Sequence, residues 1–388
     1  MRNIALILAS LFFLALILEL STRFFSDLPP RLLQRNAQIG GAYIPNIQVT
    51  LKGPESGQQI AIRTNNEGFR GAEVSRQKPA NTLRIAVLGD SQMAAINTPE
   101  KHIFSSLLEK KLAAEHPDNN WQVLNFSVSG ASTGQELNLY RKVVRQYQPD
   151  LVICVYYNGN DFSDNSLVMS RNPRIYLTLD ANGNLVTQSL DGAGGLLAWI
   201  KRHSRFYQWQ KLTVRAARKN AIKSGWLGSK NRIRGGLLAY INPQNNPTLS
   251  AVWQLNDALL GTFNTEVKND GAQFLLVSIP HSLEFDRDVL ERINISMSQA
   301  GYADSFSPAQ VESRLRSTSR SHDISAIFLN DKFAQSLAHG KIADRNFHLT
   351  YLNGNGHINE AAHRLISDVV GDAIKVDETG NSGLSILN

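Results

Sequence analysis

The sequence predicts an α/β fold with three layers, in which a five-stranded parallel sheet lies between helices. Two observations predict this class: five short apolar runs are spaced along the chain, and segments with helical apolar spacing lie between them. Parallel strands are covered on both faces and are therefore apolar throughout. The expected strands are Leu83–Leu88, Trp121–Phe126, Leu151–Tyr156, Gln273–Ile279 and Ile324–Phe328.

The expected helices have apolar residues at intervals of three or four positions, which places these residues on one face. The first such face consists of Phe104, Leu107, Leu108 and Leu112, and the second of Leu137, Tyr140, Val144 and Tyr147. Two later helices are expected at Thr248–Lys268, which Asn269-Asp270-Gly271 would end, and at Asn359–Ile374.

The first 25 residues contain an uninterrupted apolar run, Ile4–Leu18, preceded by Arg2. As a helix this run is about 23 Å long, short of the ~30 Å hydrocarbon core, so its length fits a signal-peptide core as well as a membrane span. Glu19-Leu20-Ser21 offers no good cleavage site of small residues. We therefore expect an uncleaved signal-anchor at residues 1–25, with the rest of the chain outside the cytoplasm.

Residues 26–80 are polar, contain several prolines and glycines, and indicate a linker and lead-in to a domain at 81–376. Within the lead-in, Asn65–Gly71 predicts a turn that packs Phe69 against the sheet. A long insertion at about 163–246 separates the third and fourth strands, and loops of this length commonly form a cap or lid. A short tail is expected at 377–388.

A basic segment lies within this insertion. Lys201–Arg234 contains eleven lysines and arginines and no acidic residue, with Trp209 and Trp226 among them. Such a run is most often a solvated face, and contact with anionic lipid headgroups or an acidic polysaccharide is the second interpretation. We expect no nucleic-acid partner, because no nucleic-acid-binding module is recognisable.

The most informative segment, Gly89-Asp90-Ser91-Gln92, directly follows the strand Leu83–Leu88, where α/β sheets open their sites to solvent. Three more patterns follow in order: Asn125–Gly130, Asn158–Asp161 and Gly354–His357. A serine needs a base such as histidine to take its proton. An oxyanion needs fixed donors, which the Gly130 and Ser91 N–H groups and the Asn160 amide would supply. These residues predict acyl transfer.

Each pattern taken alone also has a structural interpretation. Ser91 fits a helix N-cap, Gly130 an ordinary turn, Asn160-Asp161 an Asx-turn and His357 a surface histidine. The joint order of the four patterns favours the catalytic interpretation. Asp90 and Asp161 are expected to order the loops that carry the serine and the asparagine.

The four patterns resemble the motif blocks of the SGNH (GDSL) hydrolase family, over roughly residues 60–375. The resemblance implies a flavodoxin-like α/β/α sheet, with Ser91 as nucleophile, Gly130 and Asn160 at the oxyanion and His357 as base. The lead-in Asn65–Gly71 is similar to that of membrane-anchored bacterial members. The implied activity is that of a serine esterase, or an acyltransferase, acting on O-acyl and foremost O-acetyl groups of a cell-envelope carbohydrate.

Two departures from the family pattern concern the site. Asn158 stands where the third block begins with glycine, and Gly354 and Asn355 stand where the family has an aspartate before the histidine. The amide oxygen of Asn355 is then one candidate for orienting His357, beside a backbone carbonyl or a carboxylate from elsewhere. The missing aspartate also leaves a second function open, that of a non-catalytic polysaccharide-binding or scaffold protein with a decayed site.

The sequence contains no recognisable cofactor or metal motif. It has no His-Glu-x-x-His or Cys-x-x-Cys pattern and no phosphate-binding Gly-Lys-Ser/Thr loop, so we expect no cofactor and no metal. The single cysteine, Cys154, lies in the apolar run Leu151–Val155, which favours burial over catalysis. The expected partners are an acylated carbohydrate substrate and, through the N-terminal helix, a membrane.

Overall fold

The structure is a computed structural model that describes residues 2–26, 28–36, 38–53, 57–170, 174–189, 195–224, 235–340, 356–376 and 384–387. The chain forms two compact units. The first consists of Met1–Arg31 and Asp191–Arg232, and the second, which contains the sheet, consists of Leu32–Leu190 and Ile233–Asn388.

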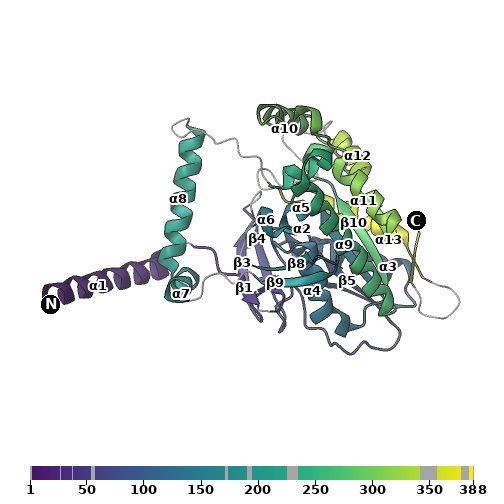
Figure 1. Cartoon of the computed structure of the whole chain (residues 1–388). Helices are drawn as coiled ribbons and strands as arrows, with labels where there is room; N and C mark the ends of the chain where they lie inside the picture. Colours follow the sequence, from purple (N-terminus) through teal and green to yellow (C-terminus); the bar gives the residue numbers. More distant parts are fainter. Residues whose placement is uncertain are drawn as a thin grey trace. The chain divides into compact units, whose positions relative to one another are not determined.

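The centre of the second unit is a five-stranded sheet with the order β11-β10-β7-β5-β6, and all its paired strands are parallel (Figure 1). The strands are β5 (Thr82–Leu88), β6 (Asn120–Asn125), β7 (Leu151–Tyr157), β10 (Gln273–Ile279) and β11 (Ser325–Phe328). In chain order this is the 2-1-3-4-5 arrangement of flavodoxin-like folds. The predicted fold class is confirmed, and each strand lies within a residue or two of its predicted bounds.

Helices cover both faces of this sheet (Figure 1). Alternate residues of β5 point to opposite sides, so Leu83, Ile85 and Val87 belong to one core cluster and Ala86 and Leu88 to another. The first cluster is completed by α3 (Phe104–Glu115) and α13 (Glu360–Ala373), and the second by α4 (Thr133–Lys142), α9 (Pro247–Asn269) and α11 (Gln310–Ser321). Cys154 is buried in the second cluster.

One helix differs from its prediction. The apolar spacing from Leu137 to Tyr147 predicts a single helix, but α4 ends at Lys142 and the 3-10 turn η2 (Val144–Tyr147) follows. Val143 between them has a φ of −130° and a ψ of −60°, outside the helical region. Two adjacent β-branched valines are poor helix formers, and the break occurs there.

Residues 32–63, expected to be linker, instead form two antiparallel hairpins in the same unit as the sheet: β1 (Leu33–Asn36) with β2 (Gly40–Tyr43), and β3 (Gln48–Lys52) with β4 (Gln59–Arg63). The lead-in turn that follows packs Phe69 edge-on against Phe126, with 4.8 Å between the ring centroids. This turn therefore attaches the lead-in to the end of β6.

The insertion contributes to both units. Hairpin β8 (Ile175–Leu179) with β9 (Leu185–Ser189) belongs to the second unit, while α7 (Leu196–His203) and α8 (Arg205–Lys223) join α1 (Arg2–Phe25) in the first. Within α1, the 23 residues Asn3–Phe25 have a mean hydropathy of 2.6, apolar and long enough for a membrane anchor or a signal sequence. Trp226 lies outside the described residues.

The remaining elements are short or peripheral. They are α2 (Ser91–Ala94), α5 (Asp161–Asp164), α6 (Leu167–Ser170), α10 (Arg287–Gln299), α12 (Asn330–Gly340), β12 (Ile374–Val376) with β13 (Leu384–Ile386), and the 3-10 turns η1 (Glu100–His102), η3 (Gly235–Tyr240), η4 (Pro243–Asn245), η5 (Ser282–Glu284) and η6 (Ala303–Ser305).

Candidate active site

Two loops with candidate residues leave the sheet next to each other. Ser91 follows the end of β5 and Asn160 follows the end of β7, and these two strands are neighbours. From β5 the chain continues to β6, its neighbour on one side, and then passes to β7, its neighbour on the other side. The strand order therefore reverses at β5. Ligand sites of open parallel sheets form at such switch points.

The structure brings Ser91 and His357 together. Helix α2 begins at Ser91, but Asp90 is its cap, because the Asp90 carboxylate accepts a hydrogen bond of 2.8 Å from the Gln92 N–H. The Ser91 hydroxyl lies 2.9 Å from His357 Nε2. The serine O–H donates to Nε2 in the tautomer of the ring that carries its proton on Nδ1. Asn355, one of the candidates for orienting His357, lies outside the described residues.

Gln92 holds the backbone on both sides of His357. Its Nε2 donates to the carbonyl of Gly356 at 3.0 Å, and its Oε1 accepts from the Ile358 N–H at 2.9 Å. Gln92 is itself buried at the start of α2. One side chain therefore couples the loop that carries the serine to the loop that carries the histidine.

The two predicted oxyanion residues have different surroundings. Asn160 Nδ2 donates to Asp90 at 3.1 Å and to Asp164 at 3.2 Å, so both amide protons are directed at carboxylates. A bond from this amide to an oxyanion requires release of one of them. Gly130 is exposed after β6, its φ of +78° favours glycine, and its carbonyl accepts from Arg174 at 3.0 Å.

Three carboxyl groups at or near the site are buried: Asp90, which lines a cavity there, Glu136 and Asp161. Burial raises the pKa of Asp90, while hydrogen bonds from the Gln92 N–H and Asn160 act in the opposite direction. Burial, reinforced by the charge of Asp90, raises the pKa of Glu136 to about 8. The pKa of Asp161 is raised well above its usual range, first by burial and then by Glu136 and Asp90. Asp161 also accepts from the Tyr157 N–H at 2.7 Å, which orders the turn before Asn160.

Asn158 stands where the third motif block of SGNH hydrolases begins with glycine, and its contacts give it a structural role. Its side chain is fully buried, donates to the Glu284 carboxylate at 3.0 Å and accepts from the Ser278 hydroxyl at 2.9 Å. Glu284 also accepts from Tyr240 at 2.6 Å and from the His281 N–H at 2.7 Å. This network attaches the loop after β7 to the loop after β10.

A cavity of about 430 Å³ opens at the dyad. Ser91, Gln92, Asn160 and His357 line it, whereas Gly130 is not among the lining residues. The lining also includes Tyr157, His281, Leu237 and Ile293. His281 Nδ1 accepts from the Leu283 N–H at 3.1 Å, which fixes the proton of a neutral ring on Nε2.

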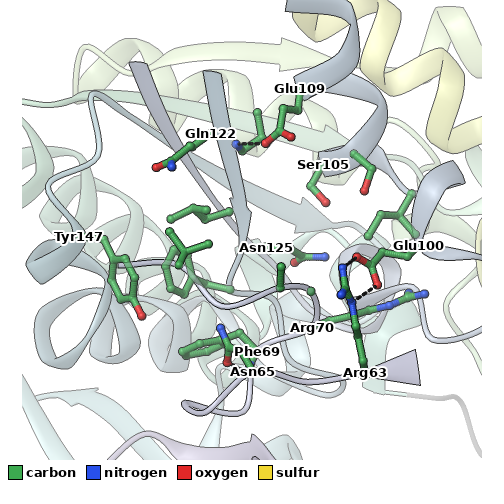
Figure 2. A pocket seen from close by; sticks show the side chains of 18 of the residues that line it. Arg63, Asn65, Phe69, Arg70, Glu100, Ser105, Glu109, Gln122, Asn125 and Tyr147 are labelled. Carbon is green, nitrogen blue, oxygen red and sulfur yellow. Dashed lines mark hydrogen bonds and ion pairs between the residues drawn. The ribbon is translucent and has the colours of Figure 1, made fainter. Parts of the chain in front are cut away.

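A second cavity, of about 450 Å³, lies between the lead-in, α3 and β6 (Figure 2). Figure 2 shows the ion pair of Arg63 with Glu100, 3.0 Å apart, and Arg70 beside it. The Arg70 side chain is buried and donates to the carbonyls of Ala94 and Ala95 and, at 2.6 Å, of Thr98. Burial lowers its pKa to about 10. Arg70 thus supports the end of the helix that begins with Ser91.

Sequence reasoning missed two of these residues as parts of the site. Gln92 stands within the first motif and Arg70 within the lead-in, but the sequence pattern assigns neither a role. The available signals were a polar residue directly after the serine and an arginine between a phenylalanine and a glycine. Their partners are distant in sequence, and local patterns do not reveal them.

No protein-family model and no curated protein sequence matches the chain. The chain is similar in structure to a two-domain esterase described as active on acetylated mannans, with 10% identity and a TM-score of 0.37, over 74% of this chain and 48% of that one. It is also similar to an acetyl xylan esterase from Geobacillus stearothermophilus, with 10% identity and a TM-score of 0.39, over 74% and 91% of the two chains. The chain is similar as well to TesA, with 14% identity and a TM-score of 0.33, over 74% of this chain and 95% of that one. The function is therefore inferred from the site itself.

Proposed function

We propose that this chain is a serine esterase that works through an acyl-serine intermediate. The observation that carries the proposal is the 2.9 Å separation of Ser91 Oγ and His357 Nε2, which both line a cavity at the switch point of the sheet. A nucleophile within hydrogen-bond reach of its base is the arrangement that acyl transfer needs.

The proposed reaction begins when Ser91 Oγ attacks the acyl carbonyl and His357 Nε2 takes the hydroxyl proton. The tetrahedral intermediate collapses as His357 returns that proton to the leaving alcohol, which leaves the acyl group on Ser91. A water molecule then repeats the sequence in the second half and releases the acid. If a sugar hydroxyl takes the place of water, the same site performs acyl transfer.

The proposed oxyanion donors are the Ser91 and Gly130 N–H groups and the Asn160 amide. Asn160 already lines the cavity, and its amide is held by Asp90 and Asp164. Of these two carboxylates, Asp164 also forms an ion pair with the Arg174 guanidinium, at 3.9 Å. We propose that Asn160 exchanges this second bond for one to the oxyanion.

The proposed substrate is an O-acyl, and foremost an O-acetyl, group of a cell-envelope carbohydrate. The resemblance of the four motifs to SGNH hydrolases supports the substrate class. The apolar helix α1 supports the location, with the catalytic unit anchored on the outer side of the membrane. The hydrogen bonds of the Glu19 carboxylate to the start of α8 support an uncleaved anchor, because cleavage after α1 would remove them.

Turnover of a chromogenic acetyl ester by the full chain tests the proposal, with Ser91→Ala beside the wild type. We expect Ser91→Ala to abolish turnover and labelling by a fluorophosphonate probe while leaving the melting temperature nearly unchanged. Probe labelling that persists in Ser91→Ala would show that another residue is the nucleophile. A folded wild type without turnover or labelling would favour the non-catalytic polysaccharide-binding function.

A further inference from the structure

The helices α7 and α8 present basic and aromatic side chains without any acidic residue from 195 to 224. Trp199 and Trp209 are exposed, at 57% and 42%. In α8, Lys211, Arg215 and Arg218 recur at intervals of four and three, which places them on one side of the helix, and all three are exposed. Phe206, Trp209 and Ala217 lie on the opposite side at helical spacing.

The end of the apolar helix α1 is attached to the beginning of α8. Glu19 directly follows the run Ile4–Leu18, and its carboxylate accepts from the backbone N–H groups of Arg205 at 3.0 Å and Phe206 at 3.1 Å. It also accepts from the Ser204 hydroxyl at 2.7 Å. A carboxylate at a helix N-terminus satisfies free N–H groups and interacts favourably with the helix dipole.

Two arginines strengthen this attachment. Arg23 donates to the carbonyl of His203 at 3.1 Å, and Arg205 donates to the carbonyls of Leu28 at 3.1 Å and Pro29 at 3.2 Å. The start of α8 is therefore attached to the end of α1 and to the residues that directly follow it. In Figure 1, α8 is directed across the line of α1 rather than along it.

We propose that α7 and α8 form an interfacial surface that lies on a bilayer containing anionic lipid, beside the point where α1 leaves it. A helix held across the end of a membrane span lies parallel to the membrane plane. Basic residues on one side with Trp and Phe on the other are typical of interfacial helices, whose apolar side enters the headgroup boundary and whose cations meet lipid phosphates. The proposal rests on the proposed membrane span and is independent of the esterase chemistry.

A spin label on Ala217→Cys in the full chain tests this, because Ala217 is exposed on the apolar side of α8 and the native Cys154 is buried. The protein is reconstituted in phosphatidylcholine vesicles with or without phosphatidylglycerol. With phosphatidylglycerol we expect the label to be accessible to oxygen and protected from a water-soluble nickel chelate. The protection should be lost in Lys211→Gln/Arg215→Gln/Arg218→Gln and at high salt.

The matched control is Arg287→Gln/Arg292→Gln/Arg364→Gln, which removes three exposed positive charges from the second unit and should leave the protection unchanged. Equal nickel access with and without phosphatidylglycerol, or equal protection of the wild type and the α8 variant, would overturn the proposal. Protection that appears only when an acidic polysaccharide is added would assign the surface to that ligand instead. Extraction of the wild type by carbonate would overturn the membrane span and this surface, but not the esterase.

Discussion

Gln92 contacts the backbone on both sides of His357, and this contact predicts a positioning role. Gln92→Ala removes both bonds, so the imidazole should lose its fixed place beside Ser91. Since a misplacement of about 1 Å costs up to about 10²-fold in rate, we expect kcat to fall about 10- to 100-fold with little change in KM.

Gln92→Glu is the informative second variant, because it keeps the acceptor for the Ile358 N–H and loses the donor to Gly356. Its kcat on a chromogenic acetyl ester should also fall, because a carboxylate oxygen then faces the Gly356 carbonyl oxygen. Equal kcat in all three proteins, with unchanged circular dichroism, would show that the clamp does not position the histidine.

Asn160 gives a second prediction at this scale. If its amide moves to the oxyanion, Asn160→Ala should lower kcat by about 10²–10³ and alter KM little, because the bond strengthens only in the transition state. Steady-state kinetics on the same ester measure both constants. A raised KM with unchanged kcat would mean that Asn160 binds the substrate in its ground state.

At the scale of single elements, the short helix α2 depends on support from outside itself. Ala95 at its end has a left-handed φ of +48°, and Arg70 donates to the carbonyl of Ala94 and, together with the Thr98 N–H, to that of Ala95. The residues of the lead-in thus act on the helix that presents Ser91.

Arg70→Met should destabilise the protein by at least about 2 kcal/mol, because it removes the Arg70 donor from the carbonyls of Ala94 and Thr98. Arg63→Met is the matched control, since the Arg63 side chain is 55% exposed and its ion pair with Glu100 contributes about 0–1 kcal/mol. Urea unfolding followed by tryptophan fluorescence compares them. An Arg70→Met loss no larger than that of Arg63→Met would contradict a supporting role.

At the scale of the whole molecule, the buried carboxyl groups make stability depend on pH. Glu136 has a folded pKa of about 8 against an ordinary value of 4.5. Below about 4.5 the group is protonated in both states and costs nothing. As pH rises from about 4.5 to about 8, the unfolded chain loses the proton first, so the free energy of unfolding falls.

Glu136→Gln keeps the shape of the side chain and removes its titration. Its melting temperature should therefore decline less between about pH 5 and about pH 8 than that of the wild type, by at least about 2–4 °C, or about 1 kcal/mol in a large domain. Glu291→Gln, on the exposed side of α10, should follow the wild type. The same dependence of the melting temperature on pH in all three proteins would refute the assignment.

The sequence by itself determined the sheet and the order of the loops at its edge. Apolar runs such as Leu83–Leu88 and Leu151–Tyr156 have to be buried on both faces, and buried parallel strands place the residues after their ends at one edge. The apolar pattern therefore predicts that Ser91 and Asn160 lie at the same edge of the sheet. The resemblance of the four motifs to SGNH hydrolases singles out His357 as the base that a serine nucleophile requires.

Only the tertiary structure decided which polar groups these residues meet. Gln92 and Gly356 are 264 positions apart, and Glu19 and Arg205 are 186 positions apart. The hairpins within 32–63 and the break of α4 at Val143 were likewise not evident from composition or spacing. The physical reason is the same in each case. Burial follows from the type of a residue and can be read locally, whereas a hydrogen-bond partner depends on which distant segments the packed sheet brings within about 3 Å.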